Sequence, residues 1–310
     1  MPESKILFRV VLHRYALVTA CCTFVLLLAG ALVTSTGSSL AVPDWPLSFG
    51  KFFPPMTGGV LFEHGHRMVA FTVACLMTGL AFYTQRVEQR AWVKRLAWAA
   101  LGAVVLQAVL GGVTVLLHLP TQVSVAHAGL AQIFFCLIVT LALVTSKGWI
   151  EEQPHRLTDR RSPIRLWAAW TTALVYLQIV IGAVTRHSGA GLAIPDFPLS
   201  FGQILPPDWS SLIALQFSHT RVGALTILIL VTHTSYRVCF HFPEEKGLFW
   251  PAAAAGLVVW FQCFLGMLII FTQKAIVPTS VHVVIGGALL ASMLVLTLKS
   301  HQLFRKETVS

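Results

Sequence analysis

Long apolar runs alternate with short polar segments along the whole chain. Eight of these runs are long enough to cross about 30 Å of hydrocarbon as an α-helix, which takes roughly 20 residues. Of the 310 residues, 56% are hydrophobic and only 11% are charged, which is too apolar for a water-soluble domain of this length. We therefore predict an all-α membrane protein whose solvent is the lipid bilayer. The eight predicted transmembrane helices cover residues 13–35, 62–83, 95–117, 122–145, 164–186, 213–236, 250–272 and 279–299.

The net charge of +10 at pH 7 comes from basic residues that gather on alternate loops. The only basic residues of the opposite loops are Lys51, Arg186 and Lys274. Because basic loops stay on the cytoplasmic side, we expect both termini in the cytoplasm and the long loops 36–61 and 187–212 outside. Topology thus explains the charge without a nucleic-acid partner. The basic loops carry Lys5, Arg9, Arg14, Arg86, Arg90, Lys94, Arg95, Lys147, Arg156, Arg160, Arg161, Arg165, Arg237, Lys246, Lys299, Arg305 and Lys306.

The N-terminal segment shows no cleavable leader, because the first apolar run continues to full spanning length. The start of the chain, with Glu3, also differs from Arg- and Ser-rich organellar transit peptides, so we expect a bacterial cytoplasmic (inner) membrane. None of the six cysteines lies in a predicted outer loop, and we expect no structural disulfide.

A duplicated loop motif divides the chain into two similar halves. The segment Gly37 to Gly50, GSSLAVPDWPLSFG, recurs from Gly189 to Gly202 as GAGLAIPDFPLSFG. Each half has four predicted helices, so the halves share one orientation and are expected to be related by a pseudo-twofold axis along the membrane normal. We predict two four-helix bundles, residues 1–150 and 164–310, joined by a cytoplasmic linker at 151–163. The repeated loops suit simple turns; the alternative is that they cover a ligand pocket.

Four of the twelve histidines fall in the first turns of the helices that begin on the outer side. At a rise of about 1.5 Å per residue, their side chains should lie at a similar depth below the outer surface. The repeat pairs His66 with His219, and it pairs His127 with His282 through the QxxLG motif that precedes each. One membrane histidine is often only a hydrogen-bonded core residue, but four matched ones favour a ligand. Two imidazoles from facing helices can hold heme iron from both sides.

Zinc is the alternative metal, but it usually takes a third or fourth protein ligand, and no cysteine or carboxylate is repeated beside the histidines. Arg67 and Arg221 follow the first histidine of each pair. A guanidinium there is a candidate partner for heme propionates, and an anchor at the membrane interface is the equal alternative. Histidines without a repeat partner are candidate site residues of lower priority. They are His64, His118, His187 and His233.

One residue near these histidines differs between the halves. Glu63 lies one helical turn before His66, whereas the second half has Gln216 at the matching place. A carboxylate at the edge of a membrane pocket is costly unless it is used, and it can move protons or stabilise positive charge, which a glutamine cannot. The structural alternative is a glutamate that caps its own helix. The asymmetry favours chemistry in the first half.

Together these features resemble the heme A synthase family over nearly the whole chain. The resemblance rests on the duplicated eight-helix plan, the GSSLAVPDWPL loop, Glu63-x-x-His66-Arg67 and the three later histidines. It implies oxidation of the C8 methyl of heme O to a formyl group by successive hydroxylations, which gives heme A for terminal oxidases. It also implies a cofactor heme b on His219 and His282. The heme O substrate is then expected between His66 and His127, with Glu63 as the catalytic carboxylate.

The chain departs from one version of the family pattern, in which an outer loop of the first half carries two cysteines. Val42 and Ser48 stand near those positions. Any mechanism that needs an outer-loop disulfide is therefore unsupported here, although the family also has cysteine-free members. Heme O synthase and an electron-transfer protein are the partners that the resemblance suggests, and an oligomer is compatible with it.

Two other hypotheses use the same residues. A diheme b-type electron-transfer protein would hold two permanent hemes on the matched histidines without chemistry on either. A transporter with a parallel repeat is less favoured, because the only repeated polar groups inside are the histidines and a few glutamines.

Overall fold

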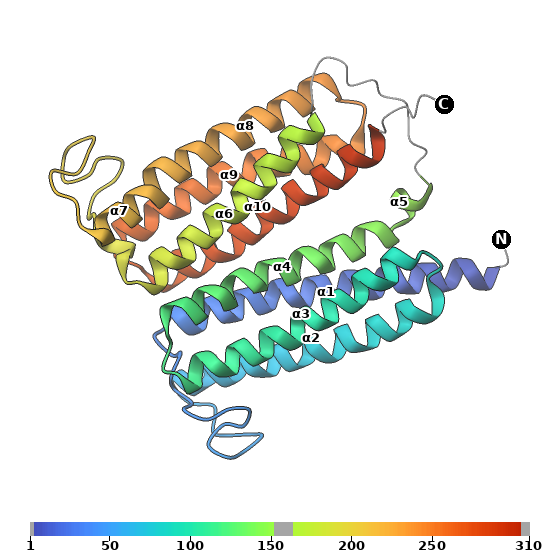
Figure 1. Ribbon diagram of the computed structural model, residues 1–310, viewed down its shortest axis with the longest axis horizontal. Helices are drawn as coiled ribbons and strands as arrows, with labels where there is room; N and C mark the ends of the chain where they lie inside the picture. Colours follow the sequence, from blue (N-terminus) through green and yellow to red (C-terminus); the bar gives the residue numbers. More distant parts are fainter. Residues whose placement is uncertain (1–2, 152–163, 305–310) are drawn as a thin grey trace.

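The computed structural model describes residues 3–151 and 164–304, and most of them are helical (Figure 1). Eight helical spans are long and apolar enough to cross a membrane, so the predicted all-α membrane architecture is confirmed. Most of them extend beyond the predicted apolar runs, because polar residues near the helix ends are helical too. The predicted linker, 151–163, lies outside the described residues apart from Glu151. The elements are α1 (Glu3–Ser35), α2 (Gly59–Val87), α3 (Ala91–Leu116), α4 (Thr121–Thr145), α5 (Lys147–Glu151), α6 (Ile164–His187), η1 (Ala190–Leu192), α7 (Ser211–Phe217), η2 (Ser218–Gly223), α8 (Ala224–His241), α9 (Lys246–Phe271) and α10 (Ile276–Leu303).

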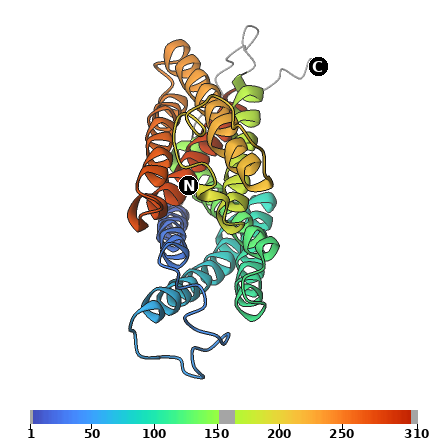
Figure 2. The same cartoon turned by 90° about the vertical axis from the view of Figure 1, so that its left-hand side faces the viewer.

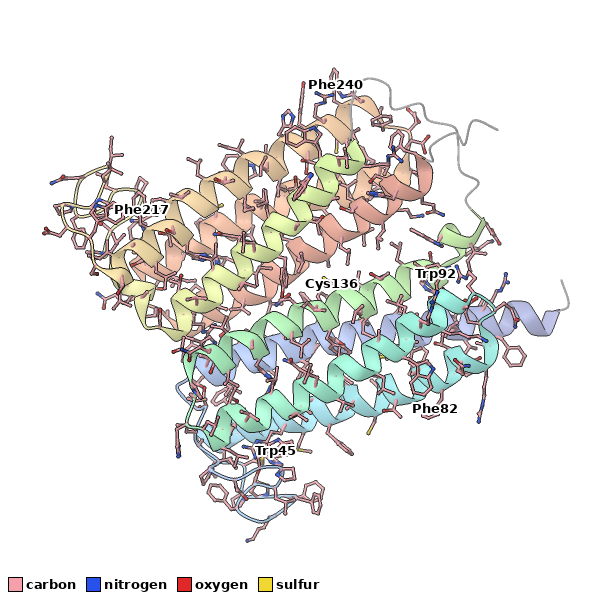
Figure 3. All side chains as sticks on the ribbon, viewed as in Figure 1. Trp45, Phe82, Trp92, Cys136, Phe217 and Phe240 are labelled. Atoms are coloured by element: carbon pink, nitrogen blue, oxygen red, sulfur yellow. The ribbon has the colours of Figure 1, made fainter. Side chains whose placement is uncertain are left out.

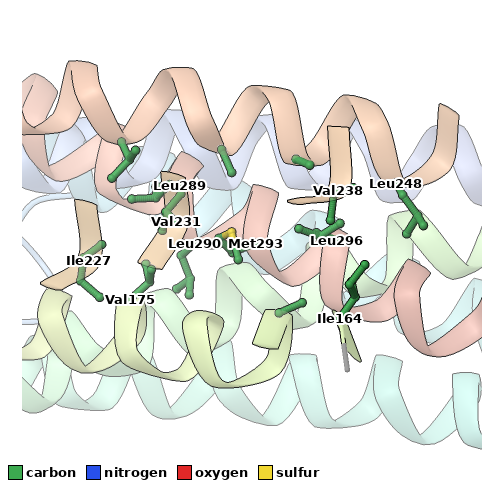
Figure 4. Packing of buried hydrophobic residues seen from close by; sticks show 14 of the residues in the cluster. Ile164, Val175, Ile227, Val231, Val238, Leu248, Leu289, Leu290, Met293 and Leu296 are labelled. Carbon is green, nitrogen blue, oxygen red and sulfur yellow. The ribbon is translucent and has the colours of Figure 1, made fainter. Parts of the chain in front are cut away.

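Each half of the chain packs around its own apolar core (Figure 1). In the first half, α1 to α4 bury side chains such as Leu80 and Ile138. In the second half, α6, α8, α9 and α10 bury Val231, Leu290 and Leu296 (Figure 4). The large side chains on the outside are apolar as well, as a lipid-facing surface requires (Figure 3).

The halves meet through four helices, and Figure 2 shows them from the end that carries the long loops. Helix α1 contacts α10, α4 contacts α6, and α4 also contacts α10. In the repeat, α1 corresponds to α6 and α4 corresponds to α10. The contact of α1 with α10 is therefore equivalent to the contact of α6 with α4. This reciprocity is what a twofold relation requires, while the axis and the cytoplasmic position of the termini stay predictions.

The two long loops fold in the same way, as their sequence repeat predicts. The carboxylate of Asp44 accepts hydrogen bonds from the backbone N–H groups of Phe49 (2.7 Å) and Gly50 (2.8 Å). Asp196 accepts the equivalent bonds from Phe201 and Gly202, both at 2.7 Å. The backbone N–H of Gly50, followed by that of Phe49, holds the pKa of Asp44 below its usual range. The pKa of Asp196 is lowered by the same kind of bonds, with that from Gly202 as the largest cause.

These lowered pKa values predict that acid loosens both loops. A carboxylate with a depressed pKa stabilises the folded loop above its ordinary pKa, and this contribution disappears as the pH falls through the lowered value. We expect amide exchange at Phe49 and Gly50 to accelerate, beyond its intrinsic pH dependence, on acidification. The Asp44→Asn variant should lose this response in the first loop only, with the Asp196 loop as the internal control. Unchanged protection of both loops in acid would contradict the role of the carboxylates.

Candidate functional site

Each of the four matched histidine rings lies against a glycine of a neighbouring helix. A Cβ built on Gly182 would lie only 2.7 Å from Cε1 of His219. For the other three pairs this separation is 3.1 to 3.3 Å, which is tighter than ordinary van der Waals contact. A side chain at Gly182 would force the His219 ring to move, and at the other three positions the ring would have to shift by a few tenths of an ångström. The contact glycines are Gly30 for His66, Gly111 for His127, Gly182 for His219 and Gly266 for His282.

The repeat in the sequence indicates these contact glycines, because each one recurs at a matched position in the other half. Gly30 and Gly182 are separated by the same number of residues as Gly37 and Gly189, which begin the repeated loops. The other two contact glycines end the repeated QxxLG motifs. The glycines therefore repeat together with the histidines that they accommodate.

Glutamines from the same helices bind the backbone of three of the four histidines. Gln107 donates to the carbonyl of His127 (2.9 Å), and Gln262 donates to that of His282 (3.0 Å). Gln178 lies 2.8 Å from the carbonyl of His219 and also 3.1 Å from its Nδ1. The matching position in the first half is Leu26, so His66 lacks such a partner. The first half thus holds one of its histidines less firmly.

The two matched histidines of each half lie near each other. The rings of His66 and His127 lie within electrostatic range of each other, and so do those of His219 and His282. Nδ1 of His66, His127 and His282 is buried without a hydrogen-bond partner in the described chain. Buried polar atoms are rarely left unpaired, which points to a ligand.

The donor set of each pair fits a heme. Within residues 3–151 and 164–304 no group of three or more His, Cys, Asp or Glu side chains could hold a metal ion. A porphyrin supplies four nitrogen ligands itself and needs only one or two from the protein. Pairs of imidazoles are therefore suited to heme iron, whereas zinc would lack protein ligands.

Glu63 is buried beneath the first long loop, with only 3% of its surface exposed. One carboxylate oxygen accepts the backbone N–H of Val42 (2.8 Å), and the other lies 2.7 Å from Nη2 of Arg67. No bond joins the carboxylate to the backbone of its own helix among the described contacts, so the capping interpretation is wrong. Glu63 instead ties the loop to α2.

Gln216 performs the same structural task in the second half. Its Oε1 accepts the backbone N–H of Ile194, which matches Val42 in the repeat. Its Nε2 donates to the carbonyls of Gly191 (3.1 Å) and Ile194 (3.2 Å). The two halves therefore share the position of this side chain and differ in its charge.

The arginines that follow the histidines hold the same loops. Arg67 donates to the carbonyls of Asp44 (2.7 Å) and Leu47 (2.8 Å). Arg221 donates to the matching carbonyls, those of Asp196 and Leu199. The structure thus gives both guanidinium groups a task in holding the loops.

A turn of π-helix keeps this arrangement despite an extra residue. Arg67 follows Glu63 by four residues, but Arg221 follows Gln216 by five. In a regular α-helix the extra residue would turn Arg221 away from its loop by about 100°. The wider turn of η2, between α7 and α8, absorbs that residue. The sixth predicted span, 213–236, is thus one span, Ser211–His241, built from α7, η2 and α8.

The first half has a second polar pair that the second half lacks. Ser48 Oγ lies 2.8 Å from Nδ1 of His64, which is buried, and Nε2 of His64 has no partner in the described chain. In the second half Phe217 occupies the place of His64, and Oγ of Ser200 is buried without a partner. His64 thus belongs to the loop contacts around Glu63. The repeat did not indicate this, because His64 has no counterpart in the second half.

Trp45 brings the first loop close to the histidine pair. A Cβ built on Gly112 would lie 2.7 Å from the ring of Trp45, so the indole lies on α3 next to Gly111. Gly111 is in turn the contact glycine of His127. The loop therefore reaches from α2 across to α3 beside the candidate site.

The other three histidines without a repeat partner lie in different places, and one of them, His187, is within electrostatic range of His127. His118 lies in the turn after α3 with a positive φ of 58°. His187 ends α6, and its carbonyl accepts a bond from Thr121 (3.3 Å). His233 lies in α8 and packs edge-on against Trp167 of α6.

A comparison with protein families gives the context for this geometry. Residues 59–294 match the family COX15-CtaA, described as cytochrome oxidase assembly protein. The chain belongs to this family. The matched region contains all four paired histidines and Glu63.

Relatives named heme A synthase cover most of the chain. The protein of Alkalihalophilus pseudofirmus is 28% identical over 291 residues, which are 93% of this chain and 96% of the relative. That of Symbiobacterium thermophilum is 32% identical over 242 residues, or 74% and 78% of the two chains. That of Bacillus cereus strain 03BB102 is 26% identical over 275 residues, or 86% of each. The COX15-CtaA match thus agrees with the resemblance seen in the sequence.

Substitution of a contact glycine should displace the histidine beside it. We expect Gly182→Ala to push the His219 ring aside and to reduce the heme retained by the purified protein several-fold, measured from its absorption spectrum. Gly102→Ala is the matched control, because a Cβ there meets nothing within 4 Å. Alanine favours a helix by about 1 kcal/mol over glycine, so a general loss of helix stability is not the expected cause. A full heme spectrum in Gly182→Ala would refute the contact-glycine role.

Proposed function

We propose that this member of the COX15-CtaA family is a heme A synthase, which oxidises the C8 methyl of heme O to a formyl group. The observation that carries the proposal is the matched set of histidine pairs, in which a carboxylate stands beside only one pair. Family membership and the names of the relatives support it. The chain is a multi-pass membrane protein, and we propose a bacterial cytoplasmic membrane with the heme sites toward the outer face.

The second half is the proposed site of a permanent heme b, with His219 and His282 as iron ligands. Support comes from Gln178, which donates to the carbonyl of His219 and so fixes the helical turn that carries the ring. Groups that orient a metal ligand strengthen its hold on the metal. When bound, heme b supplies one-electron transfer.

The first half is the proposed substrate site, where His66 and His127 receive heme O. His66 has no glutamine partner because Leu26 occupies the matching position. A substrate site must release its product, so an iron ligand that is held less firmly suits it. Trp45 and the first loop lie beside this site, where they can exclude water from the bound substrate.

Glu63 is the proposed catalytic carboxylate. Conversion of a methyl to a formyl group consumes one water equivalent and releases four protons and four electrons. Hydroxylation in two steps gives a geminal diol, which loses water to form the aldehyde. A carboxylate at the site can accept a released proton or stabilise positive charge on the substrate, and Gln216 can do neither. Arg67 keeps the carboxylate oriented through their ion pair.

The alternative of a diheme electron-transfer protein shares the histidine pairs but gives no reason for the unequal side chains at 63 and 216. The names of the relatives do not favour it. Heme O synthase and an electron-transfer protein remain proposed partners, and Arg67 and Arg221 remain proposed partners of heme propionates.

Co-expression of the protein with a source of heme O tests the proposed reaction. Extracted hemes, separated by chromatography and identified by mass, should include the hydroxylated and formyl products. A preparation that binds heme but yields neither product would show that the enzyme hypothesis is wrong.

Exchange of the side chains at 63 and 216 tests the catalytic carboxylate. Glu63→Gln should lower conversion at least about 100-fold, the usual scale of acid–base catalysis, while heme b in the second half stays bound. Gln216→Glu is the matched control and should create no activity in the second half. Full conversion by Glu63→Gln would exclude Glu63 as the catalytic residue.

Removal of a proposed iron ligand tests the cofactor site. His219→Ala should lose most of the tightly bound heme b, measured as the pyridine hemochrome. His233→Ala is the control, because that ring packs on Trp167 and is assigned no ligand role. Equal heme content in both variants would be evidence against His219 as a ligand.

A further inference from the structure

An arginine without a counterpart in the repeat lies between the two halves. Arg186 is near the end of α6 that leads into the second long loop, and the matching residue of α1 is Thr34, which carries no charge. Its Nη2 donates to the carbonyl of Ala31 (3.1 Å) and to Oγ of Ser35 (2.8 Å), both on α1. Arg186 is the last residue of the predicted helix 164–186, and its side chain crosses to the other half.

The partners of Arg186 are all neutral. In the described chain, ion pairs join Arg67 to Glu63, Arg90 to Glu88 and Lys147 to Glu151, and none includes Arg186. Its Nε and Nη1 make no hydrogen bond within the same residues. A guanidinium near the end of a membrane-spanning helix is stabilised by an anion beside it. Nε and Nη1 of Arg186 are available to bind an anion that the chain does not supply.

The contacts of Arg186 connect it to the frameworks of both histidine pairs. It lies one helical turn after Gly182, the contact glycine of His219, and its partner Ala31 is next to Gly30. Ser35, its other partner, is 2.9 Å from Oγ of Ser280, two residues before His282. Arg186 and His282 also lie within electrostatic range.

We propose that Arg186 binds a propionate carboxylate of the heme held by His219 and His282, and that its charge raises the midpoint potential of that heme. The proposal rests on the heme sites of the proposed function. A guanidinium with free N–H groups binds a carboxylate through two parallel hydrogen bonds. A nearby cation stabilises the reduced heme, which carries one positive charge less than the oxidised form.

Redox titration of the purified holoprotein, prepared from cells without heme O, tests the effect of the charge. Arg186→Gln should lower the midpoint potential of the heme b, whereas Arg186→Lys should stay close to the wild-type value. Arg165→Gln is the matched control, because Arg165 lies at the opposite end of α6 and donates to the carbonyl of Phe304. An unchanged potential in Arg186→Gln, or an equal shift in Arg165→Gln, overturns the proposal.

Esterified heme tests the contact itself. The wild-type apoprotein should bind heme b dimethyl ester several-fold more weakly than heme b, and Arg186→Gln should reduce this difference. If the glutamine variant does not fold, Arg186→Lys replaces it, because lysine cannot form the two parallel bonds and the difference should shrink there too. An equal penalty for esterification in wild type and variant overturns the proposal. Neither readout depends on heme A synthesis, so failure of the reaction leaves this test intact.

Discussion

The close approach of four imidazoles to four helix backbones is the constraint on which the rest of the structure depends. Each ring lies where a side chain of the neighbouring helix would crowd it, and α1, α3, α6 and α9 present glycine at that depth. Because the rings and the glycines lie on different helices, the packing of each bundle and the placement of its histidines are one problem. The sequence repeat preserves both sets of residues together.

The outer loops depend on the same helices. In each half, the side chain one turn before the first histidine and the arginine after it bind loop backbone. The histidine is thus flanked by two loop anchors, and displacement of the loop would disturb its surroundings. In the first half, His64 and Trp45 add further contacts to the loop. This supports a loop that covers the site over one that merely connects two helices.

Hydropathy and the repeat predicted much of this from the sequence. The eight spans followed from the length of the apolar runs, and the correspondence between the histidines of the two halves followed from the repeat. The contact glycines were not predicted, because hydropathy gives the length of a helix but not which face meets a neighbour. The π-turn was missed as well, although the extra residue before Arg221 indicated it. The partners of Arg186 could not follow from the sequence, because only tertiary packing shows that this end of α6 faces α1.

An experimental structure of the heme-loaded protein tests the central claim most directly, namely that matched histidine pairs hold two hemes in unequal halves. We expect one porphyrin with its iron between His66 and His127, and a second with its iron between His219 and His282. Glu63 should then lie beside the first porphyrin, with Gln216 at the corresponding place in the second half. A single heme between the halves, or iron bound by other residues, would contradict the account.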